Sequence, residues 1–266
     1  MDESPIARAC DRLLAAYESG IPTTPITEDG PVSPEAAYGI QLHQVDAWLA
    51  AGRQIAGFKV GLTSRAIQLQ LGVDRPDFGH LFSDMILDGT EAIDISRFLS
   101  PRLEPEISFV LKEELAGPGL TVVDIIGAID YAIASVELID SRIADWKITL
   151  ADTIADNASA GGVVLGVKPL RIDAADLGLI GCVVQKNGEV VATGAGAAVL
   201  GHPLNAVLFL ANTLGSLGRS LPPGSVVMAG ALTAAVPIAR GDRFTATFAQ
   251  LGGLDVAFTS QAGVTP

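Results

Sequence analysis

Three glutamates are the residues of this sequence whose type and spacing could bind a metal ion. Glu104 and Glu106 stand one residue apart ahead of an apolar run, and Glu137 lies inside a later apolar run. Side chains at positions i and i+2 of a β-strand face the same side, so the first two should project together. Carboxylates this close repel each other unless a cation lies between them, and all-oxygen ligands favour Mg²⁺ or Mn²⁺ over Zn²⁺. The alternative is that both acids are solvated at a strand end.

Pro105 separates the two acids and cannot donate a hydrogen bond to a neighbouring strand. This proline predicts a strand start, a sheet edge or a bulge at its position. Glu137 is the predicted third ligand, because an acid within an apolar strand is costly to bury unless it is paired or coordinated. Asp140 and Arg142 follow closely and could pair with each other.

Lys59 and Asp77 could move protons beside such an ion. Lys59 lies in GFKVG (57–61), an apolar stretch whose glycines allow close backbone approach and where burial would lower the lysine pKa. A surface lysine on an edge strand fits the same residues. Asp77 lies in PDFG (76–79), which is also an ordinary turn sequence.

Other polar residues indicate a functional site less clearly. Asp156 and Asn157 fit helix-cap or turn positions as well as a site. His202 precedes a proline and is expected to begin a helix, and His43 and His80 are likewise assigned no catalytic role.

Helices are predicted mainly at the beginning of the chain. Residues 1–55 show helical apolar spacing, with one helix that begins at Ser33-Pro34 and ends at Gly52. A strand pattern follows at 55–63 (IAGFKVGLT), and a short helix is expected after it. A further helix is predicted from Val123 to about Ala132, leading into the strand that carries Glu137.

The later part of the chain is rich in β patterns. An Asn187-Gly188 turn predicts a hairpin, and further β runs lie at 225–233, 243–251 and 254–260. Many short strands with few helices argue against a doubly wound parallel sheet. We predict an α+β fold in which a helical N-terminal region with a first strand (1–68) packs on a mixed, mainly antiparallel β domain (69–266).

Charge and composition narrow the possible partners. The formal net charge of −13 and the absence of a basic cluster disfavour binding to nucleic acid or to anionic membranes. The sequence lacks a signal peptide and a membrane span, and Cys10 and Cys182 read as free thiols, so we expect a cytoplasmic protein. Charged residues make up only 18%, against roughly 25% in typical domains. This low charge favours a homo-oligomer, and the exclusion of nucleic acid and anionic membranes makes a small molecule the expected ligand.

Three further motifs can be set aside. GAGAAVLG (194–201) lacks the third glycine of a dinucleotide-binding motif, because position 199 is valine. A phosphate loop of the G-x-x-x-x-G-K type and a zinc motif are absent from the sequence.

Six blocks carry a family resemblance: GFKVGLTS (57–64), LGVDRPDFGHLFSDM (71–85), PRLEPEISFVL (101–111), VELIDSRIADWKI (136–148), DTIADNASAG (152–161) and GAGAAVLGHP (194–203). In this order they resemble the 2-keto-4-pentenoate hydratase family of the fumarylacetoacetate hydrolase superfamily. The resemblance implies the C-terminal fold type of that superfamily and a Mg²⁺ or Mn²⁺ ion held by Glu104, Glu106 and Glu137. Pro105 departs from the small residue that usually separates the two acids.

The same resemblance implies roles for the residues around the ion. Lys59 corresponds to the family's active-site lysine, as an acid or base or as a clamp on the substrate carboxylate. Asp77 would shuttle a proton or orient water. Ser159 would touch the substrate, Phe78 would form an apolar wall, and Leu71 would help to line the pocket.

The implied activity is that of a metal-dependent lyase from aromatic-compound degradation, which hydrates a 2-hydroxy-2,4-dienoate to a 4-hydroxy-2-oxo acid. A 4-oxalocrotonate decarboxylase is the alternative, since GALTAAVP (230–237) looks more like that sister enzyme. A C–C hydrolase of the superfamily and a non-catalytic paralogue are further readings. Enzymes of these pathways can associate, so a sister enzyme is a possible partner beside the small 2-oxo or 2-hydroxydienoic acid.

Overall fold

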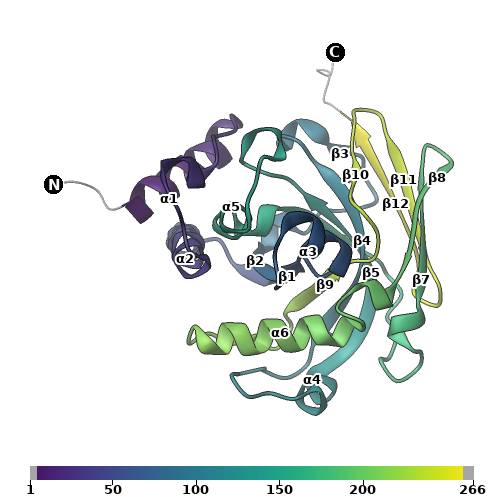
Figure 1. Ribbon diagram of the computed structural model, residues 1–266. Helices are drawn as coiled ribbons and strands as arrows, with labels where there is room; N and C mark the ends of the chain where they lie inside the picture. Colours follow the sequence, from purple (N-terminus) through teal and green to yellow (C-terminus); the bar gives the residue numbers. More distant parts are fainter. Residues whose placement is uncertain (1–4, 260–266) are drawn as a thin grey trace.

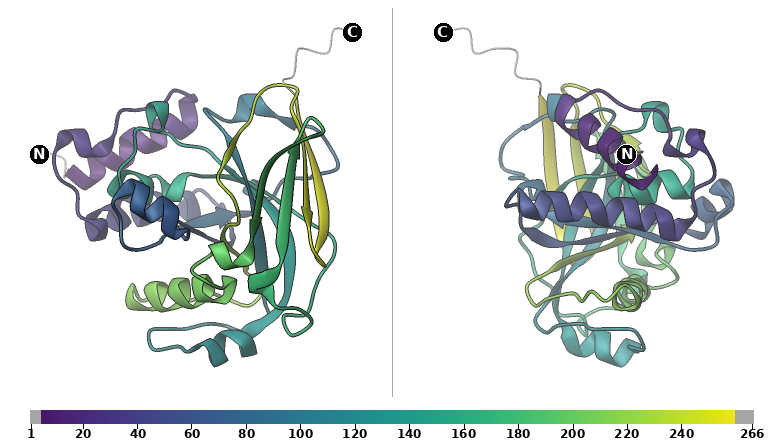
Figure 2. Two further views of the ribbon diagram at one scale, coloured as in Figure 1. Left: turned by 45° about the vertical axis from the view of Figure 1, so that its right-hand side comes forward. Right: turned by 90° about the vertical axis from the view of Figure 1, so that its left-hand side faces the viewer.

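The computed structural model describes residues 5–259 of the 266-residue chain, without the side chains of Gln70 and Leu71. Two helices, α1 (Pro5–Ser19) and α2 (Pro34–Ala50), form one side of the molecule, as Figures 1 and 2 show. Ser33 caps α2, because its side chain accepts a hydrogen bond from the amide of Ala36 and a proline follows at the first helical position. The predicted helix start at Ser33-Pro34 is therefore confirmed.

The central sheet has seven strands in the order β2-β1-β9-β4-β5-β6, with β10 also paired to β4. Its strands are β1 (Ile55–Gly61), β2 (Asp77–Phe82), β4 (Arg102–Leu111), β5 (Ile129–Ile139), β6 (Ala160–Leu165), β9 (Val226–Ala231) and β10 (Val236–Pro237). Every pairing in it is antiparallel except β1 with β9. β1 lies within residues 1–68 yet pairs with strands of the later region, and the division at residue 68 stays a prediction.

A second sheet of five strands, ordered β3-β12-β11-β7-β8, stands on the opposite side of the molecule from α1 and α2 (Figure 2). It comprises β3 (Ile93–Asp94), β7 (Gly181–Lys186), β8 (Glu189–Ala195), β11 (Arg243–Phe248) and β12 (Gly252–Thr259). β7 and β8 form the predicted hairpin, with Asn187 and Gly188 both at positive φ (54° and 87°), as its two-residue turn requires. The predicted α+β fold with mainly antiparallel strands is confirmed.

Helix α6 (Pro203–Ser216) packs beside the central sheet, next to α4 (Val122–Ala128), as Figure 1 shows. The segment Gly196–Ser216 is apolar enough to span a membrane by length and composition. Half of α6 is buried in the main core, including Val207, Leu210 and Leu214. A place in the core explains this composition. The short helices α3 (Arg65–Leu71) and α5 (Leu150–Ala155) follow β1 and precede β6.

One local prediction is corrected by the long pairing of β4 with β5. The predicted helix from Val123 to about Ala132 begins at Val122 and ends at Ala128, because Ile129 already pairs with Leu111 of β4. Cross-strand pairing along the whole of β5 overrides the local helical spacing.

Pro105 lies neither at a strand start nor at an edge, because β4 is flanked on both sides. Its carbonyl accepts a hydrogen bond from the amide of Leu232, at the junction where the partner of β4 changes from β10 to β9. The N–H and C=O of one strand residue point to the same side of the strand. The N–H that Pro105 lacks would therefore point at the junction between β10 and β9, and no hydrogen bond between strands is lost. The register of β4 against β9 also shifts just after it, between Glu106 and Ser108, which is the predicted irregularity.

Candidate metal and acid–base site

Three glutamates converge on one face of the central sheet. Glu104 and Glu106 come from β4, and Glu137 of β5 lies directly opposite Glu104 in the strand register. One carboxylate oxygen from each lies within 4.8 Å of the other two. Glu106 and Glu137 are buried and Glu104 is half-buried. The two-residue spacing on β4 and the cross-strand pair thus bring the three predicted ligands together.

The oxygens of this cluster are poorly supplied with hydrogen bonds. Glu106 Oε2 accepts from the amide of Gly230 at 2.8 Å, but its Oε1 and Glu137 Oε2 are buried without a hydrogen-bond partner in the described part of the chain, and Glu137 Oε1 has only the ammonium of Lys59, 3.3 Å away. Buried acceptors are normally satisfied, so a group of orphaned carboxylate oxygens calls for a ligand. Their number, type and closeness fit a hard divalent cation.

Gly230 explains how the β9 backbone reaches Glu106. Its φ is 116°, and a Cβ at this position would lie 2.2 Å from Thr63 Oγ1. Only glycine allows this conformation and this close approach together. The amide of residue 230 can therefore point at the carboxylate.

The charges in the cluster are far from balanced. Burial, followed by repulsion from Glu137, raises the pKa of Glu104 to about 7, and the same two causes raise the pKa of Glu106 well above its ordinary value. Burial also raises the pKa of Glu137, although Lys59 opposes it. One lysine cannot neutralise three carboxylates, and a divalent cation would supply the missing positive charge.

Lys59 of β1 is fully enclosed beside the cluster. Its Nζ lies 3.3 Å from Glu137 Oε1 and donates to the carbonyl of Ala158 at 2.8 Å. Burial alone would lower the pKa of Lys59, but the carboxylates around it, Glu137 foremost, raise the pKa above its ordinary value. The expected lowering of this pKa is therefore wrong for the site as described, because four acidic neighbours outweigh desolvation.

A strained turn presents the carbonyl that Lys59 binds. Asn157, Ala158 and Ser159 have φ values of 52°, 50° and 52°, a left-handed conformation that costs non-glycine residues about 1–2 kcal/mol each. Asp156 holds the turn from one side, because its Oδ2 accepts from Ser159 Oγ at 3.1 Å and its Oδ1 accepts from Arg142 Nε at 2.6 Å. The surrounding structure thus over-determines a turn that serves the site.

Asn157 holds the same turn from the other side. Its side chain accepts from the amide of His80 at 2.7 Å and donates to the carbonyl of His80 at 2.9 Å. Two hydrogen bonds to β2 therefore tie the turn to the edge of the sheet next to β1.

Asp77 begins β2 on the same face as Lys59. It pairs with Gly61, and a Cβ on that glycine would lie 2.2 Å from Asp77 Oδ1 and 3.5 Å from Lys59 Nζ. Asp77 Oδ2 accepts from Thr153 Oγ1 at 3.1 Å, whereas Oδ1 is buried without a partner in the described structure. Burial raises the pKa of Asp77, and Lys59 opposes that rise. One oxygen of this carboxylate is anchored and the other is free to accept a proton.

The structure does not bring Phe78 to the glutamates, although it was expected to form an apolar wall. Phe78 pairs with Val60, so strand alternation puts it on the opposite face from Asp77 and Lys59, and its ring stacks on Tyr38 at 4.6 Å. The hydroxyl of Ser159 is engaged with Asp156. The expected contribution of Leu71 falls on a side chain outside the described residues.

Comparison with known proteins gives the chain its family. No family model matches it. The TodF product hydratase of Pseudomonas putida is 44% identical over 254 residues, which are 95% of each chain. The 2-keto-4-pentenoate hydratase of Paraburkholderia xenovorans is 42% identical over 253 residues, 95% of this chain and 94% of the relative. The chain belongs to the 2-keto-4-pentenoate hydratase family.

Solved structures agree with the fold. The 4-oxalocrotonate decarboxylase of Pseudomonas putida G7, complexed with magnesium and adipate, is 39% identical with a TM-score of 0.92, over 97% of this chain and 98% of its own. Fumarylpyruvate hydrolase of Pseudomonas aeruginosa, at 15% identity and a TM-score of 0.60, covers 78% of this chain and 89% of its own. That second likeness shows the shared fold of the fumarylacetoacetate hydrolase superfamily alone.

Sequence reasoning missed the residues that support Lys59 in this hydratase-family chain. Asp156 and Asn157 were expected to be helix-cap or turn residues or part of a site, and they do form a turn, but their hydrogen bonds to Arg142, Ser159 and His80 were not predicted. Arg142 was expected only as a partner of Asp140. Arg142 Nη1 does lie 3.9 Å from Asp140 Oδ2, but its shorter contact is with Asp156. The available signal was three polar residues, Asp156, Asn157 and Ser159, just before the apolar run AGGVVL (160–165).

Proposed function

We propose that this chain is a hydro-lyase that adds water to a 2-hydroxy-2,4-dienoate and yields a 4-hydroxy-2-oxo acid. The observation that carries the proposal is the convergence of three glutamates, Lys59 and Asp77 on one face of the sheet. Relatives with the matching names support the substrate class. A 2-hydroxypent-2,4-dienoate hydratase of Pseudomonas putida is 46% identical over 220 residues, 82% of this chain and 99% of the relative.

Glu104, Glu106 and Glu137 would hold a divalent metal ion, for which Mg²⁺ has the most direct support. The decarboxylase neighbour is complexed with magnesium in one structure and with calcium in another. When bound, such an ion acts as a Lewis acid toward the carboxylate and 2-oxo oxygens of the substrate. Mn²⁺ remains the alternative ion on the chemistry of the oxygen ligands alone.

Lys59 and Asp77 divide the proton transfers in this proposal. The dienol loses its 2-hydroxyl proton and gains a proton at C5, which gives the conjugated 2-oxo-3-enoate, and water then adds its hydroxyl to C4 and a proton to C3. Asp77 Oδ1, the free oxygen of an anchored carboxylate, accepts the proton of the incoming water. Lys59 Nζ, fixed between Ala158 and Glu137, holds the substrate carboxylate or returns a proton to carbon.

The decarboxylase is the one competing function with a specific observation behind it, namely the TM-score of 0.92 to 4-oxalocrotonate decarboxylase. That relative is less identical (39%) than the TodF product hydratase (44%). A homo-oligomer, association with a sister enzyme and a cytoplasmic location also remain predictions.

The test is an absorbance assay with Mg²⁺ and 2-hydroxypenta-2,4-dienoate. We expect loss of the dienol absorbance with wild type and at least a 100-fold slower loss with Asp77→Asn, because general acid–base groups contribute roughly 10²–10⁴-fold. Replacement of Glu113, an exposed acid outside the site, by glutamine is the matched control and should leave the rate unchanged. A wild-type enzyme that leaves the dienol intact and releases carbon dioxide from 2-oxo-3-hexenedioate would contradict the proposal.

A further inference from the structure

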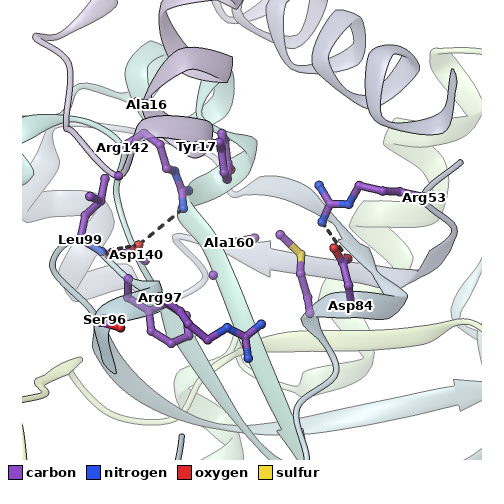
Figure 3. Close-up of a pocket in the computed structure, with 14 residues that line it drawn as sticks. Ala16, Tyr17, Arg53, Asp84, Ser96, Arg97, Leu99, Asp140, Arg142 and Ala160 are labelled. Atoms are coloured by element: carbon purple, nitrogen blue, oxygen red, sulfur yellow. Dashed lines mark hydrogen bonds and ion pairs between the residues drawn. The ribbon is translucent and has the colours of Figure 1, made fainter. Parts of the chain in front are cut away.

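A cavity of about 330 Å³ lies apart from the three glutamates, between α1, the end of β2 and the segment 96–100 (Figure 3). None of the proposed metal, proton-transfer or substrate residues lines it. Its floor and sides are partly apolar, with Met85, Phe98, Leu99 and Ala160 among the lining residues. The cavity is large enough for a small organic molecule.

Three arginines from separate segments surround this cavity. Figure 3 shows Arg142 after β5, Arg53 before β1, and Arg97 of the 3₁₀ turn Ile95–Arg97 approaching one space, with Ala160 between them. Such a gathering is unexpected in a chain with a formal net charge of −13. Cations that line one cavity repel each other unless anions lie among them.

The acids nearby do not use all the donors of these arginines. Arg53 pairs with Asp84 at 2.8 Å, and Arg142 is held by Asp156 at 2.6 Å. Asp140, which also lines the cavity, accepts from the amides of residues 99 and 100 at 2.9 and 2.7 Å. Arg97 makes no ion pair or hydrogen bond within the described residues 5–259, so its guanidinium has donors to spare.

Two buried donors of the cavity also lack acceptors. Tyr17 Oη and Arg53 Nε are enclosed without a hydrogen-bond partner in the described structure. The ring of Tyr17 is fixed by the guanidinium of Arg142, 4.2 Å from its centroid. Buried donors without acceptors are costly, and a ligand that supplies charged oxygens would satisfy them.

We propose that this cavity is a binding site for a small organic carboxylate. The unpaired guanidinium of Arg97 donates to its oxygens, because a planar guanidinium fork matches a carboxylate. Tyr17 Oη and Arg53 Nε are enclosed beside the cavity and donate to the ligand once their side chains turn toward it. The apolar wall formed by Met85, Phe98 and Leu99 receives the hydrocarbon part. Inorganic phosphate shares the charge but has no hydrocarbon to bury there and fills little of the cavity.

Arg97 is the residue to change, because Arg142 also supports the turn beside Lys59 through Asp156. Arg97 is exposed, so its loss should leave the fold intact. Arg240 is a matched control, since it is an exposed arginine on another part of the surface and outside the cavity lining. Both alanine variants change the net charge by the same amount.

The experiment is calorimetric titration of the Mg²⁺-loaded protein with benzoate, with benzamide as the uncharged analogue and with inorganic phosphate. We expect benzoate binding that weakens about tenfold in Arg97→Ala and is unchanged in Arg240→Ala. Glu106→Gln should also leave it unchanged, which separates this cavity from the proposed metal site. Benzamide and phosphate should bind at least tenfold more weakly than benzoate.

Four results would overturn the proposal: no benzoate binding by wild type, equal weakening in the two arginine variants, loss of binding in Glu106→Gln, or phosphate binding as tight as that of benzoate. A thermal unfolding curve of each variant accompanies the titration and establishes that the variant is folded. The outcome is independent of whether the chain hydrates a dienoate.

Discussion

Replacing one glutamate of the cluster should make the thermal stability of the protein independent of divalent cations. Glu106→Gln keeps the size of the side chain, and the amide oxygen can still accept the hydrogen bond from Gly230. The charge is lost, and with it one of the three carboxylates that lie within 4.8 Å of one another. A substitution of this kind tests the metal site without relying on turnover.

The expected effect on the free energy of unfolding has two parts, one in the metal-free protein and one from the bound ion. At 4.8 Å and an effective dielectric constant of about 20, two unit charges repel by about 3 kcal/mol, an upper bound because proton uptake relieves part of it. The metal-free variant should therefore be at least as stable as metal-free wild type. In wild type, a cation at about 100 times its Kd adds about 2.7 kcal/mol. For 266 residues at about 2.1 cal/mol/K each, this raises Tm by about 5 °C.

Differential scanning calorimetry of protein freed of metal by chelator and dialysis, with and without Mg²⁺, measures both parts. On addition of Mg²⁺, the Tm of wild type and of the control Glu113→Gln should rise by about 5 °C. The Tm of Glu106→Gln should change little. Equal gains in wild type and Glu106→Gln would show that the ion binds elsewhere. A metal-free variant that melts well below wild type would show that the cluster is not electrostatically strained.

Three further predictions concern Lys59, Gly230 and His80. Lys59→Met should slow hydration at least ~100-fold while calorimetric Mg²⁺ affinity is kept or improved, and lost metal binding would instead make the lysine a structural residue. Gly230→Ala should destabilise the protein by more than about 2 kcal/mol in urea unfolding, because its Cβ meets Thr63 at 2.2 Å. The control Gly241→Ala, at φ 86° but with nothing within 4 Å, should cost about 1 kcal/mol, and equal costs would refute the steric argument. Burial lowers the pKa of His80 to about 3 from 6.5, so the unfolded chain takes up the proton first and stability falls as pH drops below 6.5. The loss of unfolding free energy from this group should be about 2 kcal/mol at pH 5. Urea unfolding at several pH values should show that His80→Leu removes this part of the pH dependence.

Local patterns predicted the features that depend on neighbours in sequence. The i and i+2 spacing brought Glu104 and Glu106 to one face, and Asn187-Gly188 formed its hairpin turn. Both follow from backbone geometry that a few residues determine.

Features that depend on distant residues could not be predicted in this way. The helix at Val122–Ala128 ends early because Ile129 pairs with a strand about twenty residues before it. Ala158 and Ser159 have no intrinsic preference for a left-handed turn, and the Asp156–Arg142 ion pair that holds the turn forms only in the folded chain. The raised pKa of Lys59 likewise depends on carboxylates from three other strands.

The most direct test of the central claim is the identity of the product that wild-type protein makes from 2-hydroxypenta-2,4-dienoate and Mg²⁺. Proton NMR of the reaction should show 4-hydroxy-2-oxopentanoate, with a methyl doublet from C5 beside the hydroxyl-bearing C4 and with the vinyl proton signals lost. A control without metal should show only the slow tautomerisation of the dienol. Recovery of unhydrated 2-oxo-3-enoate in the presence of Mg²⁺ and an intact fold would contradict the assignment of this chain as a hydratase.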